Sequence, residues 1–196
     1  MSLRLSLTRN ALVIMGLTLG LAACDREPAN PAQEQGALAE GKQSLLGEID
    51  TSHAGDLLPT MNVENLDGKT LNLGALQGQP VLINLWATFC APCVVEMPML
   101  DDLSDDLGGK VRVLTVSQDV KGAELVGPFF AKMKFKNLES WMETSGELGF
   151  TLGSGVLPTT VLYDASGQEV WRVVGDYDWS SAEAREAILA EAAKAE

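Results

Sequence analysis

The chain has 196 residues, of which 46% are hydrophobic, and its formal net charge is −13 at pH 7. This length is sufficient for one globular domain with appended segments. The negative charge argues against a protein that binds nucleic acid through a basic surface, because phosphates would be repelled. We therefore expect no nucleic acid among the partners.

The first residues have the pattern of a secretory signal. Arg4 and Arg9 precede an uncharged run over residues 11–24, which is short for a membrane-spanning helix and ends in small residues. The stretch Leu21-Ala22-Ala23-Cys24 resembles the bacterial lipobox, whose cysteine is acylated and becomes the first residue of the mature protein. The resemblance implies a signal peptide over residues 1–23 and a lipid on Cys24. The alternative is a plain signal peptide with a cysteine near its cleavage site.

Residues 24–56 are rich in Pro, Gly, Ala, Gln and Glu and contain few large apolar side chains. Such a segment buries too little surface to fold alone, so we expect a flexible, lipid-anchored tether. Its first residues resemble those of bacterial lipoproteins in which Asp25 would mark retention at the inner membrane. The lipobox implies a periplasmic location, where disulfides persist. His53, the only histidine of the chain, lies in this tether.

The predicted domain covers residues 57–196 and begins with a β-hairpin. Residues 61–66 and 69–73 flank Asp67-Gly68, which is a turn signal. Residues 80–86 form a continuous apolar run, as expected of a strand buried on both faces. The next segment has the apolar spacing of a helix and ends at Gly108-Gly109; its apolar positions are Val94, Met97, Leu100, Leu103 and Leu107.

The second half of the domain continues the alternation of strands and helices. Residues 111–117 predict another buried strand, and the apolar residues between 125 and 133 fit a second helix. Residues 159–164 and 169–175 predict an antiparallel hairpin, and Ser180 with Glu183 has the spacing of a capping box for a final helix. The order predicts an α/β fold in which a central mixed sheet is flanked by helices, with an N-terminal β-hairpin extension.

Cys90 and Cys93 are the only cysteines of this domain, and three kinds of site can contain such a pair. A zinc site would need two more soft ligands, which the domain lacks. An inert disulfide would close a very short loop and would remove little entropy from the unfolded chain. A redox centre fits best, because the spacing lets a disulfide form and break with little movement of the backbone.

The position of the pair supports redox chemistry. Cys90 precedes the predicted helix directly, where free backbone N–H groups and the helix dipole favour a thiolate. We therefore expect Cys90 to be the attacking thiol, and Cys93, one turn further into the helix, to resolve the mixed disulfide. Pro92 lies between them, where its missing N–H does not weaken the helix.

The sequence WATFCAPC, from Trp86 to Cys93, resembles the active-site motif of the thioredoxin superfamily. The lipobox, the leading hairpin and the sequence CVVEMP resemble the TlpA-like branch of extracytoplasmic thiol–disulfide reductases. The resemblance covers residues from about 57 to the C-terminus and implies a thioredoxin-like fold. It also implies that Trp86 packs beside the sulfur atoms, that Pro98 kinks the active-site helix, and that Pro158 is a cis-proline facing the disulfide.

The resemblance implies that Glu96 occupies the acidic position that handles protons near the thiols. The alternative is that Glu96 is a solvated carboxylate in the first turns of the helix. One residue departs from thioredoxin itself, since Asn84 replaces a buried aspartate and cannot accept a proton from Cys93. Glu96 or water must then take that proton. A carboxylate near Cys90 disfavours its thiolate, so Glu96→Gln is expected to lower the pKa of Cys90.

The sequence thus predicts an extracytoplasmic thiol–disulfide oxidoreductase that reduces client proteins through Cys90 and Cys93, without a metal or another cofactor. The resemblance implies two partners, an oxidised client bound as a mixed disulfide on Cys90 and a membrane electron donor of the thiol-transporting type. A peroxidase or a copper chaperone would need another cysteine setting or a histidine ligand. The remaining alternative is a lipid-anchored binding or holdase domain in which the CxxC is incidental.

Overall fold

The computed structural model describes residues 47–152 and 155–194. The predicted signal peptide, Cys24 and the tether up to residue 46 lie outside the described residues. No helix within the described ranges is both long enough and apolar enough to cross a membrane.

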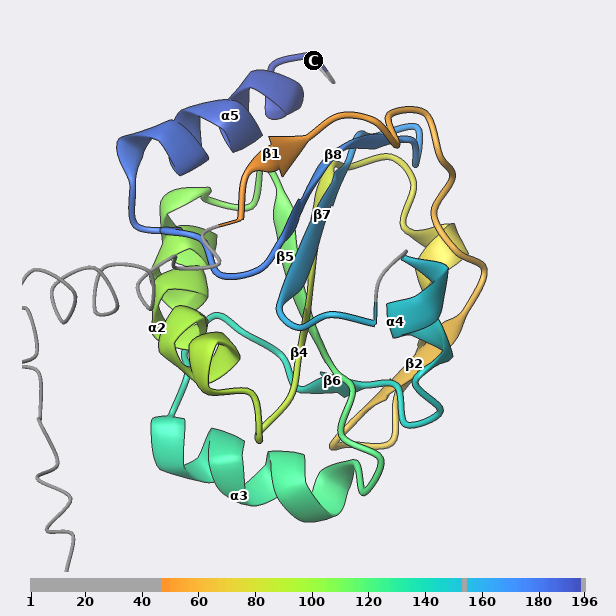
Figure 1. Ribbon diagram of the computed structural model, residues 1–196, viewed down its shortest axis with the longest axis vertical. Helices are drawn as coiled ribbons and strands as arrows, with labels where there is room; N and C mark the ends of the chain where they lie inside the picture. The colour runs from red at the N-terminus through yellow and green to blue at the C-terminus, as the bar shows by residue number, and fades with distance from the viewer. Residues whose placement is uncertain (1–46, 153–154, 195–196) are drawn as a thin grey trace, which may run out of the picture. The chain divides into compact units, whose positions relative to one another are not determined.

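A mixed β-sheet forms the centre of this part of the chain (Figure 1). Its eight strands lie in the order β1-β8-β7-β4-β5-β6-β2-β3. Strand β4 is central, since it pairs in parallel with β5 and antiparallel with β7. The strands are β1 (Ile49–Asp50), β2 (Asn62–Asn65), β3 (Thr70–Asn72), β4 (Val81–Trp86), β5 (Arg112–Ser117), β6 (Trp141–Met142), β7 (Thr159–Tyr163) and β8 (Glu169–Val174).

Helices cover both faces of the sheet, and Figure 1 shows α2 and α5 on one side of the strands and α4 on the other. The helices are η1 (Leu73–Ala75), α2 (Ala91–Asp106), α3 (Ala123–Met133), α4 (Glu147–Thr151) and α5 (Ala182–Ala192). The predicted mixed sheet flanked by helices is therefore confirmed.

Alternation along β4 divides the core into two clusters. Leu82 and Trp86 point to the face covered by α2, α3 and α5, whereas Ile83 and Leu85 point to the face covered by η1 and α4. Successive side chains of a strand point to opposite faces, so Asn84 lies on the α2 face. This register places a polar side chain beneath the active-site helix.

The predicted hairpins and the active-site helix are present. Strand β2 pairs antiparallel with β3, and β7 pairs antiparallel with β8. Helix α2 ends before Gly108, whose φ of 56° lies in the left-handed region that favours glycine at a helix end. The final helix also forms, but its N-cap is Ser181, whose hydroxyl accepts from the Ala184 N–H, and not the predicted Ser180.

Strand β6 and helix α4 are among the short elements that were not predicted. Strand β6 has two residues and joins β5 to the β2–β3 hairpin, so the hairpin extends the sheet beyond its parallel part. Helix α4 has five residues, begins after Gly146 and includes Gly149. Neither element is long enough to show a period of hydrophobic residues.

The folded part begins earlier than predicted. Strand β1 pairs with β8 at Val173 and Arg172, and the Gly47 N–H donates to the Asp176 carbonyl at 2.7 Å. The predicted boundary at residue 57 is therefore wrong, because residues 47–56 satisfy backbone hydrogen bonds along the outer edge of β8. His53 consequently belongs to the folded part and not to a tether.

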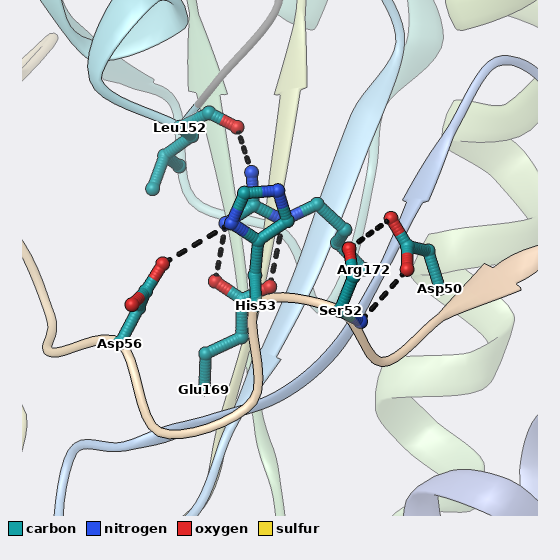
Figure 2. A network of polar contacts seen from close by, with 7 residues as sticks. All are labelled: Asp50, Ser52, His53, Asp56, Leu152, Glu169 and Arg172. Atoms are coloured by element: carbon teal, nitrogen blue, oxygen red, sulfur yellow. Dashed lines mark hydrogen bonds and ion pairs between the residues drawn. The ribbon is translucent and has the colours of Figure 1, made fainter.

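A buried ion pair lies under this N-terminal segment (Figure 2). The Arg172 guanidinium donates to both Glu169 carboxylate oxygens at 2.6 Å and also to the Leu152 carbonyl at the end of α4. Both side chains of the pair are almost fully buried. The guanidinium therefore joins β8 to the chain that leads toward β7.

Replacing Arg172 should destabilise the fold strongly. In Arg172→Met the Glu169 carboxylate stays buried without its cation, which costs about 3–5 kcal/mol of unfolding free energy. Urea unfolding of the purified protein measures this loss. The matched control is Arg112→Met, because Arg112 pairs with Glu139 at 3.3 Å on the surface and should cost at most about 1 kcal/mol. Equal losses in the two variants would contradict the prediction.

Candidate active site

Cys90 and Cys93 form a disulfide at the N-terminus of α2. Their Cα atoms are 5.3 Å apart, which lies within the range that a disulfide requires. Cys90 is 9% exposed and Cys93 is 1% exposed. The structure thus shows the oxidised form, and the first cysteine is the more accessible one.

The helix terminus offers a donor to the first sulfur. Cys90 is the N-cap residue, and the Cys93 N–H donates to Cys90 Sγ at 3.3 Å. This sulfur belongs to a disulfide here and stands in for the thiolate that reduction would leave. The same N–H and the helix dipole would then stabilise a negative charge on Cys90.

Trp86 lies beneath the disulfide in the same buried cluster as both cysteines. The residue ends β4, is fully buried, and has its ring centroid 4.9 Å from that of Phe129 and 6.0 Å from that of Phe130 on α3. These aromatic contacts hold Trp86 in place, and the active-site loop begins at the next residue.

The bond between Leu157 and Pro158 is cis. Pro158 precedes β7, and the first residue of β7, Thr159, pairs with Leu85 near the end of β4. Because Cys90 follows β4 after only three residues, the cis-proline and the disulfide lie at the same end of the sheet. The two segments come together through the antiparallel pairing of β4 with β7.

Glu96 is buried and not solvated. Its side chain is 1% exposed, and Oε1 accepts from the Tyr177 N–H at 2.7 Å. Burial raises the pKa of Glu96 to about 7, against the lowering effect of the Tyr177 N–H. Glu96 is one helical turn beyond Cys93, so both side chains lie on the same face of α2.

Two further polar side chains adjoin this carboxyl group. Asn84 donates from Nδ2 to Thr160 Oγ1 at 2.9 Å, and Trp179 is buried in the loop before α5. Both oppose the rise in the pKa of Glu96, although Glu96 Oε2 makes no hydrogen bond within the described part of the chain. Sequence reasoning missed Trp179 and Tyr177, since the loop before α5 carries no motif.

A cleft of about 320 Å³ lies beside the first turns of α2. It opens between this helix and the loop that follows β8, and Glu96 contributes to its wall. The lining residues are Pro92, Val95, Glu96, Met99, Asp176, Tyr177 and Asp178. The cleft gives the buried carboxyl group a short path to solvent.

Metal ligands do not gather near the cysteines. Residues 47–152 and 155–194 contain no group of three or more His, Cys, Asp and Glu side chains that could hold a metal ion. His53 lies next to Asp56, and the neighbouring Gly55 bonds to Glu169 at the start of β8. Glu169 pairs with Tyr163, at the end of β7 farther from Pro158, so His53 and the disulfide lie at opposite ends of the sheet.

Residues 54–184 match the AhpC/TSA family. The chain belongs to this family. The thiol-disulfide oxidoreductase ResA of a Bacillus cereus strain is 28% identical over 134 residues, which are 68% of this chain and 77% of the relative. The thiol:disulfide interchange protein DsbE of Vibrio cholerae is 31% identical over 136 residues, which are 66% of this chain and 69% of the relative.

A solved structure agrees with these relatives. The exposed lipoprotein thioredoxin of Streptococcus pneumoniae strain TIGR4 superposes with a TM-score of 0.56 at 27% identity, over 68% of this chain and 98% of that chain. The predicted thioredoxin-like fold and the TlpA-like resemblance are thereby confirmed. The prediction of a thiol–disulfide oxidoreductase is confirmed as well, against the alternative of a binding or holdase domain.

The buried carboxyl group should make the stability of the disulfide form depend on pH. The pKa of Glu96 is about 7 in the folded protein against 4.5 for the free group, so the folded state retains this proton where the unfolded state has lost it. Stability should therefore fall as the pH rises from about 5 to 8, by about 3 kcal/mol from this group.

Urea unfolding at pH 5 and pH 8 measures the effect. Glu96→Gln removes the ionisable group while preserving the shape of the side chain. From pH 5 to pH 8 the unfolding free energy of this variant should therefore fall by about 3 kcal/mol less than that of the wild-type protein. Glu143→Gln is the control, because Glu143 is also buried but receives bonds from the Ser145 and Leu148 N–H groups. Identical pH dependence in Glu96→Gln and the wild type would refute the ionisation of Glu96 as the cause.

Proposed function

We propose that the protein is a lipid-anchored, extracytoplasmic reductase that transfers electrons from the Cys90/Cys93 dithiol to disulfides of client proteins. The observation that carries the proposal is the disulfide at the N-terminus of α2, where the Cys93 N–H points at Cys90 Sγ. This arrangement favours a thiolate on the more accessible of the two sulfur atoms.

The reaction is an exchange of disulfides. The Cys90 thiolate attacks one sulfur of the client disulfide, forms a mixed disulfide and releases the other client sulfur as a thiolate. The Cys93 thiolate then attacks Cys90 Sγ and releases the second client sulfur. Two electrons pass to the client, which leaves as a dithiol, and the protein is left with the disulfide seen here.

Cys93 must lose a proton before it can attack. Asn84 has no basic group, whereas Glu96 is on the same helix face as Cys93 and has a pKa of about 7. A carboxyl group with that pKa can accept a proton near neutral pH and return it through the adjoining cleft. We assign Glu96 this role.

The client would dock at the end of the sheet that carries the disulfide. Phe89 directly precedes Cys90 and is 75% exposed, so an apolar side chain is available next to the attacking sulfur. The cis peptide at Pro158 turns the chain before β7, and we assign this segment to the alignment of the client backbone. Trp86 supports the active-site loop from below.

The anchor follows from the N-terminal sequence. Cleavage after residue 23 and acylation of Cys24 would leave residues 24–46 between the membrane and the folded part that begins by Gly47. A reductant in an oxidising compartment must be recharged, and an anchor at the inner membrane would hold it near a membrane donor of the thiol-transporting type. The pneumococcal protein described as an exposed lipoprotein thioredoxin supports this arrangement.

The direction of electron transfer follows from the thiolate partners. A strongly stabilised thiolate makes a disulfide oxidising. Ala91 and Pro92 offer no side-chain donor to Cys90, and His53 lies at the opposite end of the sheet. Within the described residues, the one hydrogen-bond donor to Cys90 Sγ is the Cys93 N–H of the helix terminus. Because no further donor stabilises the thiolate, we expect a dithiol that gives up its electrons readily.

Equilibration with glutathione buffers should give a reduction potential below about −200 mV. Pro92→His places an imidazole between the cysteines as an additional partner of the thiolate, and its potential should be less negative than that of the wild type. Pro92→Ala, which removes the proline ring without adding a donor, is the control. A wild-type value above about −150 mV would identify an oxidant and reject the proposed reductase.

The lipid anchor is tested on the native N-terminus. Mass spectrometry of the protein purified from membranes should find acyl chains on a new first residue, Cys24. Cys24→Ala should abolish acylation and thereby release the protein from membranes. A free Cys24 thiol in the mature protein, or recovery of the wild-type protein in the soluble periplasm, would contradict the anchor.

A further inference from the structure

The loop that presents Cys90 is bound by a carboxylate from the neighbouring strand. Asp119, two residues after β5, accepts the Thr88 N–H at 2.8 Å on Oδ2 and the Thr88 hydroxyl at 2.7 Å on Oδ1. Thr88 lies two residues before Cys90. The contact joins segments that are 31 residues apart in the sequence.

The carboxylate is itself held rigidly. Asp119 is 1% exposed, the Ser117 hydroxyl donates to its Oδ2 at 2.8 Å, and the Asp119 N–H donates back to Ser117 Oγ at 3.0 Å. The Gln118 N–H donates to the Trp86 carbonyl at 2.8 Å, which continues the pairing of β5 with β4. Among the described residues no ion pair involves Asp119, and its carboxylate is bound by the donors of Thr88 and Ser117.

The connection from β4 to Cys90 leaves little freedom. Only residues 87–89 separate the last residue of the strand from the N-cap, and the Cys90 N–H donates to the Ala87 carbonyl at 3.1 Å. Ala87 is buried, whereas Phe89 is exposed. Thr88 is therefore the middle residue of this loop, and its two bonds to Asp119 join the loop to the segment after β5.

We propose that Asp119 is a positioning residue for the attacking thiol: its buried carboxylate fixes Thr88 and thereby holds Cys90 Sγ against the Cys93 N–H. The proposal rests on the proposed role of Cys90 as the nucleophile. Without the contact, Cys90 would be displaced from the helix terminus, its thiolate would lose stabilisation, and its pKa would rise. Neither Asp119 nor Thr88 needs to touch the client.

A purely electrostatic role of Asp119 makes the opposite prediction. A buried negative charge near Cys90 disfavours the thiolate, so its removal alone would lower the pKa of Cys90. A role in folding alone would change stability and leave the pKa where it was. The direction in which the pKa of Cys90 shifts thus separates a positioning role from the other two roles, provided that the variants keep the negative charge at position 119.

Two variants keep the negative charge of residue 119 and weaken its contact with the loop, while the bond from the Thr88 N–H to the carboxylate remains possible. Thr88→Val preserves the shape of the side chain and removes the hydroxyl that Asp119 Oδ1 binds, and Asp119→Glu moves the carboxylate by one methylene. The control is Asp101→Glu on α2, because Asp101 accepts the N–H groups of Lys136, Asn137 and Leu138 and thus holds a loop outside the active site. All three are reduced and alkylated with iodoacetamide over a range of pH, with the labelled cysteine located by mass spectrometry.

Thr88→Val and Asp119→Glu should raise the pKa of Cys90 by about half a unit or more, which slows alkylation about threefold at pH values below that pKa. Asp101→Glu should leave the Cys90 profile unchanged. If Asp119→Glu does not fold, Thr88→Val decides alone. An unchanged or lowered pKa of Cys90 in a folded Thr88→Val variant would overturn the positioning role.

The same measurement separates this inference from the proposed function. Faster labelling of Cys93 than of Cys90 in the wild-type protein would reject Cys90 as the nucleophile, whatever the variants do. Faster labelling of Cys90 together with unaffected variants would leave the reductase proposal intact and reject only the role of Asp119.

Discussion

Strand β4 is paired on both sides and buried on both faces, and every part of the site takes its position from the end of this strand. Its parallel neighbour β5 leads to Asp119, and its antiparallel neighbour β7 follows the cis-proline. Three residues then connect β4 to the N-cap of α2. Burial on both faces fixes the register of this strand, so the disulfide, Pro158 and Asp119 are all placed at the same end of the sheet.

Two of the buried glutamates, Glu169 and Glu96, are accommodated differently. Glu169 has the Arg172 guanidinium on both oxygens, so its charge is compensated and the pair joins β8 to the end of α4. Glu96 has one backbone N–H on one oxygen, and burial raises its pKa to about 7. The first arrangement pairs the carboxylate with a buried cation. The second leaves a proton exchangeable near neutral pH, which suits a group beside a reactive thiol.

The sequence predicted the elements with a strong period and a long apolar run. Residues 80–86 and the spacing from Met97 to Leu107 correctly indicated β4 and α2, and the CxxC motif located the disulfide. Strand β1 was missed because its two residues are stabilised only by pairing with β8, and β6 for the same reason. Glu96 was identified, but its burial depends on Tyr177 and Trp179, which follow about 80 residues later. The contact of Asp119 with Thr88 also joins residues that are far apart in the sequence, and no local pattern encodes such a contact.

The N-terminal strand has a consequence for how the folded part behaves alone. Strand β1 and residues 51–57 cover the outer edge of β8, whose sequence EVWRVV is rich in β-branched and aromatic residues. An uncovered edge of this kind is a template for pairing with another chain. A protein that begins at residue 57 would therefore offer the unpaired edge of β8 to its own copies. Residues 47–56 protect the molecule against self-association of this kind.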